Sequence, residues 1–192
     1  MPRLWTQAID THRRAVRDTV VNVTRALVAA HGLRGVSMAR IADDAGVARA
    51  TLYKYFPDVE SILRAGHERE IARHLARLAR VRDRSVEPAE RLAGVLEAYA
   101  SIRQESSRHG DVDLAALLHA GQEVAHAEGL ITEMLKQLIA DAVATGAVRD
   151  DVAPGELARY CLHALGAART APSKEAVERL VQVTLAGLRR RQ

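Results

Sequence analysis

Residues 37–56 read SMARIADDAGVARATLYKYF, and this stretch decides the fold. A glycine, Gly46, follows a small residue, Ala42, at a spacing of four, with Ile41, Val47 and Leu52 as apolar neighbours. Two short helices that cross at roughly 100° need a small residue where their axes approach and a residue that tolerates positive φ in the tight turn. The stretch therefore predicts a helix-turn-helix, whose second helix lies in the major groove of DNA.

Helical periodicity and helix-ending residues continue on both sides of this stretch. Apolar residues from Val16 to Ala30 repeat at the spacing of one helix face, and Ser37 is a good N-cap for the next helix. Pro88 and Pro154 suit the first turns of later helices. An all-α fold of about nine helices is expected, covering about residues 16–30, 37–45, 49–56, 58–84, 88–105, 112–127, 130–145, 154–171 and 173–191.

Charge is distributed unevenly along the 192 residues. Residues 1–58 hold nine Lys or Arg against five Asp or Glu, whereas residues 85–192 hold twelve against fifteen. A basic N-terminal third is typical of a nucleic-acid contact at one end of a chain. The sequence has one cysteine, Cys161, and no apolar signal segment or run of the roughly 20 apolar residues that span a membrane. These features favour a protein of the reducing cytoplasm with no membrane partner.

The residues around the motif resemble TetR-type transcriptional regulators over about residues 12–66. The resemblance is carried by Thr51-Leu52-Tyr53, then Tyr55-Phe56 and Pro57 before a long helix. It implies an all-helical homodimer with a helix-turn-helix domain at 1–58, ordered from about 12, and an effector-binding and dimerisation domain at 59–192. We therefore expect a repressor that binds a palindromic operator in double-stranded DNA at the nucleoid and is released by an unknown small molecule.

Helical geometry and this resemblance together assign the DNA contacts. Arg49, near the start of the third helix, is the candidate for a bidentate contact with guanine, and Ala50 and Tyr53 for contact with a thymine methyl group. By similarity to the family, Tyr53 and the other residues contact the phosphate backbone, and Ser37 and Arg40 among them fix the register. The predicted DNA-binding residues are Ser37, Arg40, Arg49, Ala50, Thr51, Tyr53, Lys54 and Tyr55.

One position departs from the family pattern. Val59 stands near the start of the fourth helix, where the family commonly has a lysine that reaches a phosphate. That contact is expected to be absent here. Arg3, Arg13 and Arg14 in the N-terminal extension are the candidates to compensate.

The C-terminal part supplies candidates for an effector pocket and a dimer interface. Polar residues recur at i, i+3, i+4 and i+7 from His119, which would suit a metal, but long helices give such spacing by chance and no metal site or cofactor is predicted. These polar residues are better candidates for polar anchors in an otherwise apolar effector pocket. The candidate effector-binding residues are Tyr99, His119, Gln122, Glu123, His126, Met134 and His163. The candidate dimer-interface residues, on the last two helices, are Leu162, Leu165, Val177, Leu180, Val181, Thr184 and Leu188.

Two other classes of function remain as alternatives. A DNA-binding protein without an effector would not need the long apolar body beyond residue 85. An enzyme on a helical scaffold finds no support, because the sequence has no glycine-rich phosphate loop and no Gly-x-Ser-x-Gly elbow. The sequence therefore predicts a non-enzymatic regulator.

Overall fold

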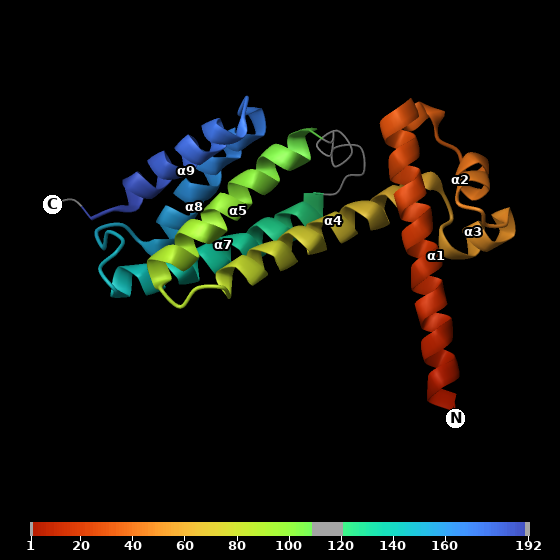
Figure 1. Cartoon of the computed structure of the whole chain (residues 1–192), viewed down its shortest axis with the longest axis horizontal. Helices are drawn as coiled ribbons and strands as arrows, with labels where there is room; N and C mark the ends of the chain where they lie inside the picture. Colours follow the sequence, from red (N-terminus) through yellow and green to blue (C-terminus); the bar gives the residue numbers. More distant parts are fainter. Residues whose placement is uncertain (1, 109–120, 191–192) are drawn as a thin grey trace. The chain divides into compact units, whose positions relative to one another are not determined.

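The structure is a computed structural model that describes residues 2–108 and 121–190, and within these residues every regular element is a helix (Figure 1). The all-α prediction is confirmed. The α-helices are α1 (Pro2–His31), α2 (Met38–Asp44), α3 (Arg49–Tyr55), α4 (Val59–Arg82), α5 (Pro88–Arg108), α7 (Gly121–Ala144), α8 (Pro154–Gly166) and α9 (Lys174–Leu188). Two short 3₁₀ helices, η1 (Leu33–Gly35) and η2 (Ala167–Thr170), join them.

The chain divides into two compact units, one up to Arg69 and one from Glu70 onward. The division falls inside α4, so the first part of this helix belongs to the N-terminal unit. Ile62 on α4 is fully buried in the same hydrophobic cluster as the helix-turn-helix residues, which explains that membership. Whether the functional roles divide at residue 58 stays a prediction.

The N-terminal unit is built around a small hydrophobic cluster. Its buried members are Val20, Val21, Leu27, Ile41, Ala42, Leu52, Phe56 and Ile62. The turn between α2 and α3 depends on Gly46, whose φ is +65°. That conformation costs glycine little and costs residues with a Cβ more. The backbone N–H of Val47 donates to the carbonyl of Ala42 over 3.0 Å and closes the turn.

The C-terminal unit has its own core, formed by the second part of α4 with α5, α7, α8 and α9. Its fully buried large side chains include Leu96 on α5, Leu138 and Ile139 on α7, and Leu165 on α8. A buried amide also ties the unit together, because Nε2 of Gln104 donates to the carbonyls of Ala171 (3.2 Å) and Ser173 (3.1 Å). In the described part of the chain, no helix combines the length and apolar character needed to cross a membrane.

Several helix boundaries differ from those expected, and α8, for example, ends at Gly166 and not near residue 171. α1 begins at Pro2, well before the first apolar repeat. α7 runs without a break from Gly121 to Ala144, so the predicted helix end near residue 127 is wrong, whereas residues 112–120 of that predicted helix lie outside the described residues. Gly129 lies inside α7, where a glycine costs a helix about 1 kcal/mol, and burial of Leu135 and Leu138 outweighs that cost.

Cys161 gives a direct test of burial in the C-terminal unit. The side chain is fully buried, and desolvation raises the pKa of its thiol to about 12. Because the thiolate is the reactive form, we expect the folded protein to react with a disulfide reagent about 10³-fold more slowly than the unfolded chain at pH 8. Rapid stoichiometric labelling of the native protein would contradict this burial.

Because the pKa of the Cys161 thiol is raised in the folded state, we expect the protein to lose stability at high pH. The folded state keeps its proton above the pH at which the unfolded chain releases it, so the free energy of unfolding should fall as pH rises from about 9 to 12. The expected slope from this group is about 1.4 kcal/mol per pH unit. Denaturant unfolding of wild type and Cys161→Ala between pH 8 and pH 10.5 checks it, since the variant should lack this component.

Candidate nucleic-acid interface

Local hydrogen bonds fix the start of α2 and, through it, the turn to α3. Oγ of Ser37 accepts a hydrogen bond from the backbone N–H of Arg40 over 3.3 Å, which is an N-cap. Ser37 is exposed, so the hydroxyl that caps α2 lies on the surface that was predicted to face DNA.

The third helix has one buried face and one exposed face. Leu52 is completely buried on one side. The structure brings four of the predicted DNA-binding residues together on the exposed side, namely Arg49, Ala50, Tyr53 and Lys54. Tyr53 is 55% exposed. This face can present donors and apolar groups to a partner without rearrangement of the core.

Two of the predicted arginines have only exposed partners. Arg49 lies 4.0 Å from a carboxylate oxygen of Asp43, and both side chains are exposed. Arg40 donates to Nε2 of His31 over 2.7 Å. Exposed ion pairs contribute about 0–1 kcal/mol, so Arg49 can leave Asp43 for an anionic or hydrogen-bonding partner at small cost.

The remaining predicted positions are less open. Thr51 and Tyr55 are half-buried, and Tyr55 packs against the N-terminal cluster. Val59 also packs against that cluster, so the position where the family commonly has a lysine is used for packing. Arg13 and Arg14 are exposed on α1, whereas the side chain of Arg3 lies outside the described residues.

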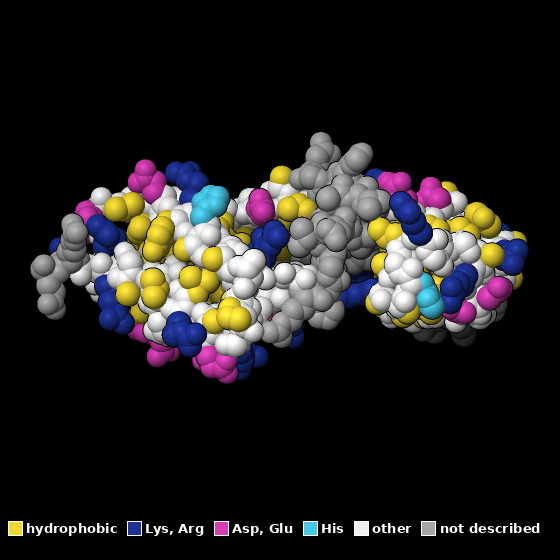
Figure 2. Space-filling view, turned by 90° about the horizontal axis from the view of Figure 1, so that it is seen from above, with side chains coloured by type: hydrophobic (Ala, Val, Ile, Leu, Met, Phe, Trp, Pro, Cys, Tyr) yellow, Lys and Arg dark blue, Asp and Glu magenta, His cyan; other side chains and the backbone are white. Residues whose placement is uncertain are grey.

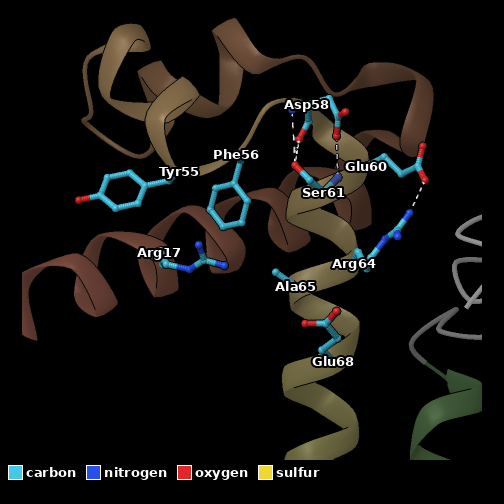
Figure 3. Close-up of a pocket in the computed structure, with 9 residues that line it drawn as sticks. All are labelled: Arg17, Tyr55, Phe56, Asp58, Glu60, Ser61, Arg64, Ala65 and Glu68. Atoms are coloured by element: carbon cyan, nitrogen blue, oxygen red, sulfur yellow. Dashed lines mark hydrogen bonds and ion pairs between the residues drawn. The ribbon is translucent and has the colours of Figure 1, made fainter. Parts of the chain in front are cut away.

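An open pocket of about 430 Å³ lies beside the motif, between α1, the end of α3 and the start of α4 (Figure 3). The guanidinium of Arg17 lies 4.7 Å from the centre of the Phe56 ring. Arg17 is not among the DNA-binding residues predicted from the sequence. The available signal was its spacing on α1, one turn before the buried Val20 and Val21. The lining residues are Arg17, Tyr55, Phe56, Asp58, Glu60, Ser61, Arg64, Ala65 and Glu68.

The predicted effector residues are not all brought together. Tyr99 is buried in the C-terminal core, where desolvation raises its pKa, and Met134 packs against the same core. Glu123 is half-buried, whereas His126 and His163 are exposed. His119 and the side chain of Gln122 lie outside the described residues.

One polar group in this region is not among the residues predicted from the sequence. Arg103 follows Tyr99 by one turn of α5, and its Nε is buried with no hydrogen-bond partner among the described residues. The charges of Arg103 and Glu128 both act on the Tyr99 hydroxyl, which places α5 and α7 groups in one neighbourhood. An unpaired buried donor is costly and suits a site that receives an acceptor from a ligand.

Most of the predicted dimer residues face the interior of the single chain, and the dimer interface stays a prediction. Five of them are buried in the core of a single chain, where they cannot present apolar area to a second copy; they are Leu165, Val177, Val181, Thr184 and Leu188. Leu162 and Leu180 are half-buried and pack against that core.

A different set of residues on α8 and α9 faces outward. Tyr160 is 44% exposed and Val183 is 66% exposed. A Cβ built on Gly187 would lie 2.9 Å from the Tyr160 hydroxyl, so the ring lies against this glycine, one turn from Val183. Figure 2 is seen from above the view of Figure 1, so it shows the side of the C-terminal unit on which α9 lies. Hydrophobic side chains are exposed on this surface.

The structure does not assemble a metal centre from the residues it describes, since no group of three or more His, Cys, Asp or Glu side chains there could hold an ion. Glu70 and His74 share a face of α4, with 2.9 Å between Oε1 of Glu70 and Nε2 of His74.

Two family profiles match the chain. The profile described as bacterial regulatory proteins, tetR family, matches residues 20–65, which contain the helix-turn-helix. The profile described as transcriptional regulator SbtR-like, C-terminal domain, matches residues 87–190, more than half of the chain.

Individual proteins agree with these matches. The HTH-type transcriptional repressor KstR of Mycobacterium tuberculosis (strain ATCC 25618 / H37Rv) is 26% identical over 139 residues, covering 72% of this chain but only 63% of KstR. A TetR/AcrR-family regulator from Thermobifida fusca YX-ER1 has a TM-score of 0.76 at 22% identity, covering 91% of this chain and 98% of that one. AibR, solved with isovaleryl coenzyme A and operator DNA, has a TM-score of 0.63 at 18% identity, covering 90% and 97%. At these identities the two structures show the fold.

Proposed function

The chain belongs to the TetR family of bacterial regulatory proteins and is a DNA-binding transcriptional regulator, and we propose that two copies repress transcription from a palindromic operator until a small molecule releases them. The observation that carries this proposal is the exposed face of α3, with Arg49, Tyr53 and Lys54 opposite the buried Leu52. We place this regulator in the cytoplasm, associated with the nucleoid.

Binding follows from the geometry of α2 and α3. With α3 in the major groove, Arg49 reaches base edges near the helix start, while Lys54 and the residues at the start of α2 meet the phosphates. Two identical subunits present two copies of α3, so the operator should consist of two half-sites about 34–36 Å apart or a multiple of that distance. The repressor activity named for KstR supports the direction of regulation.

Release by an effector requires differential binding. A ligand shifts the equilibrium only if it binds the geometry that does not fit DNA more tightly, and a tenfold loss of operator affinity needs about 1.4 kcal/mol. α4 has residues in both units, so it is the covalent element through which a change in the C-terminal unit reaches the N-terminal one. The buried Nε of Arg103, which has no hydrogen-bond partner in the part of the chain that the structure describes, favours this regulator over a DNA-binding protein that responds to no ligand.

Selection from random duplexes tests the DNA-binding half. The full-length protein should enrich a palindromic sequence, and affinity for it should fall as salt rises. A selection that enriches no palindrome would contradict the proposal.

The effector half is tested by adding isovaleryl coenzyme A and a panel of fatty acids to the operator complex, with Arg103→Met as the comparison. Release of the wild type and retention of the variant would support a site at Arg103.

An Arg49→Ala variant separates base reading from general attraction to DNA. We expect it to lose about 1–3 kcal/mol of operator affinity and to relax specificity at one base of each half-site, because Arg49 reads a guanine. Lys54→Ala should instead weaken binding to all sequences alike. Affinities for a set of single-base operator variants check both. If Arg49→Ala weakened every duplex equally, the base contact would belong to another residue.

A further inference from the structure

Arg17 differs from nearby arginines of the N-terminal unit in what it contacts. Arg64 pairs with Glu60 (2.8 Å) and Arg69 pairs with Asp18 (3.1 Å), so carboxylates offset their charges. The guanidinium of Arg17 lies instead over the ring of Phe56, 4.7 Å from its centre, and has no carboxylate partner among the described residues. An aromatic face positions a guanidinium without neutralising it. The full charge of Arg17 is therefore held in place and available to an anion.

Phe56 sets where that charge lies. It is the C-cap residue of α3 and is 2% exposed, so the guanidinium above it lies at the end of the proposed recognition helix. Figure 3 shows the Arg17 side chain extending from α1 toward this ring. The position is fixed by the buried core of the unit, to which both α1 and α3 contribute.

The opposite wall of the pocket offers no comparable cation. Val59 at the start of α4 is packed against the cluster, and Arg64 is paired. The carboxylate of Asp58 accepts the backbone N–H of Ser61 over 2.7 Å, so the first turn of α4 is already capped by a negative group. Glu68 also lines this wall. A phosphate approaching the motif is therefore attracted to the α1 side of the pocket and repelled by the α4 side.

We propose that Arg17 contacts a phosphate of the operator backbone and supplies the cation that Val59 does not. This inference rests on the proposed function and adds a contact from α1 to those of α2 and α3. The contact reads no base, so it should strengthen binding to any duplex and fix the register of α3.

The salt dependence of DNA binding tests this role. Arg17→Met keeps an apolar stem over Phe56 and removes the charge. We expect the slope of log K against log salt to fall by about 0.9 per subunit, and therefore by about 1.8 for a dimer on its operator. Affinity for random duplex should fall along with affinity for the operator. Arg17→Lys should retain the wild-type slope.

Arg64→Gln is the matched control, because it removes the same charge from the same pocket. Its slope should change less than that of Arg17→Met, since Glu60 already offsets the Arg64 charge. If Arg17→Met is folded by thermal melting and keeps the wild-type slope and affinity, Arg17 only covers Phe56 and the inference is overturned. If the wild type binds no duplex, the proposed function fails instead. Should Arg17→Met not fold, Arg17→Gln replaces it and is judged by the same slope.

Discussion

A Val183→Asp variant is expected to be monomeric and to bind a two-half-site operator about 10²–10⁴-fold more weakly than the wild type, because the second subunit no longer binds as part of the same molecule. Val183 is 66% exposed on α9, one turn before Gly187, against which the Tyr160 ring lies. A carboxylate placed there would be desolvated without a partner when two copies associate. Sedimentation velocity at micromolar concentration and operator titration measure the two effects.

Gln182→Asp is the control for this prediction. It adds the same charge to the neighbouring exposed position of α9, about 100° around the helix from Val183. It should leave the dimer and the operator affinity unchanged. The Val183→Asp variant should also bind an isolated half-site as the wild-type subunit does. A dimeric Val183→Asp protein would show that copies associate through another surface.

The helix-turn-helix could be predicted in detail because its requirements are local. The φ of +65° at Gly46 and the N-cap bond of Ser37 depend on residues a few positions away, and both are encoded by residue types with few alternatives. Hydrophobic periodicity adds which face of α3 is buried. The exposed face, which contains Arg49 and Tyr53, follows from these rules alone.

The outer surface of α8 and α9 could not be predicted in the same way. Periodicity shows that Val177, Val181 and Leu188 share a face, but it does not show whether that face packs inside the chain or against a second copy. In the structure this face packs into the core of the C-terminal unit. The outward-facing flank contains Val183 and Gly187, whose mixture of one apolar residue and one small residue gives a weak pattern.

Contacts between segments that are far apart in the sequence could not be predicted either. The stacking of Arg17 on Phe56 joins α1 to the end of α3, and no local spacing relates the two residues. The continuity of α7 through Gly129 depends on packing against α5 and α8, which outweighs the local cost of the glycine. Such tertiary effects decide helix boundaries and polar partners more than residue propensities do.

Leu52→Ala is expected to destabilise the N-terminal unit by about 2–5 kcal/mol, because Leu52 is completely buried in a small cluster that cannot fill the cavity. In a unit of this size that loss lowers the melting temperature by more than about 8 °C. Tyr53→Ala, one residue away and 55% exposed, should change stability by less than about 0.5 kcal/mol yet weaken operator binding. Calorimetry and operator titration of both variants therefore separate the face of α3 that holds the fold from the face that meets DNA. Equal destabilisation by the two substitutions would mean that these faces are assigned wrongly, because only a buried side chain leaves a cavity when it is truncated.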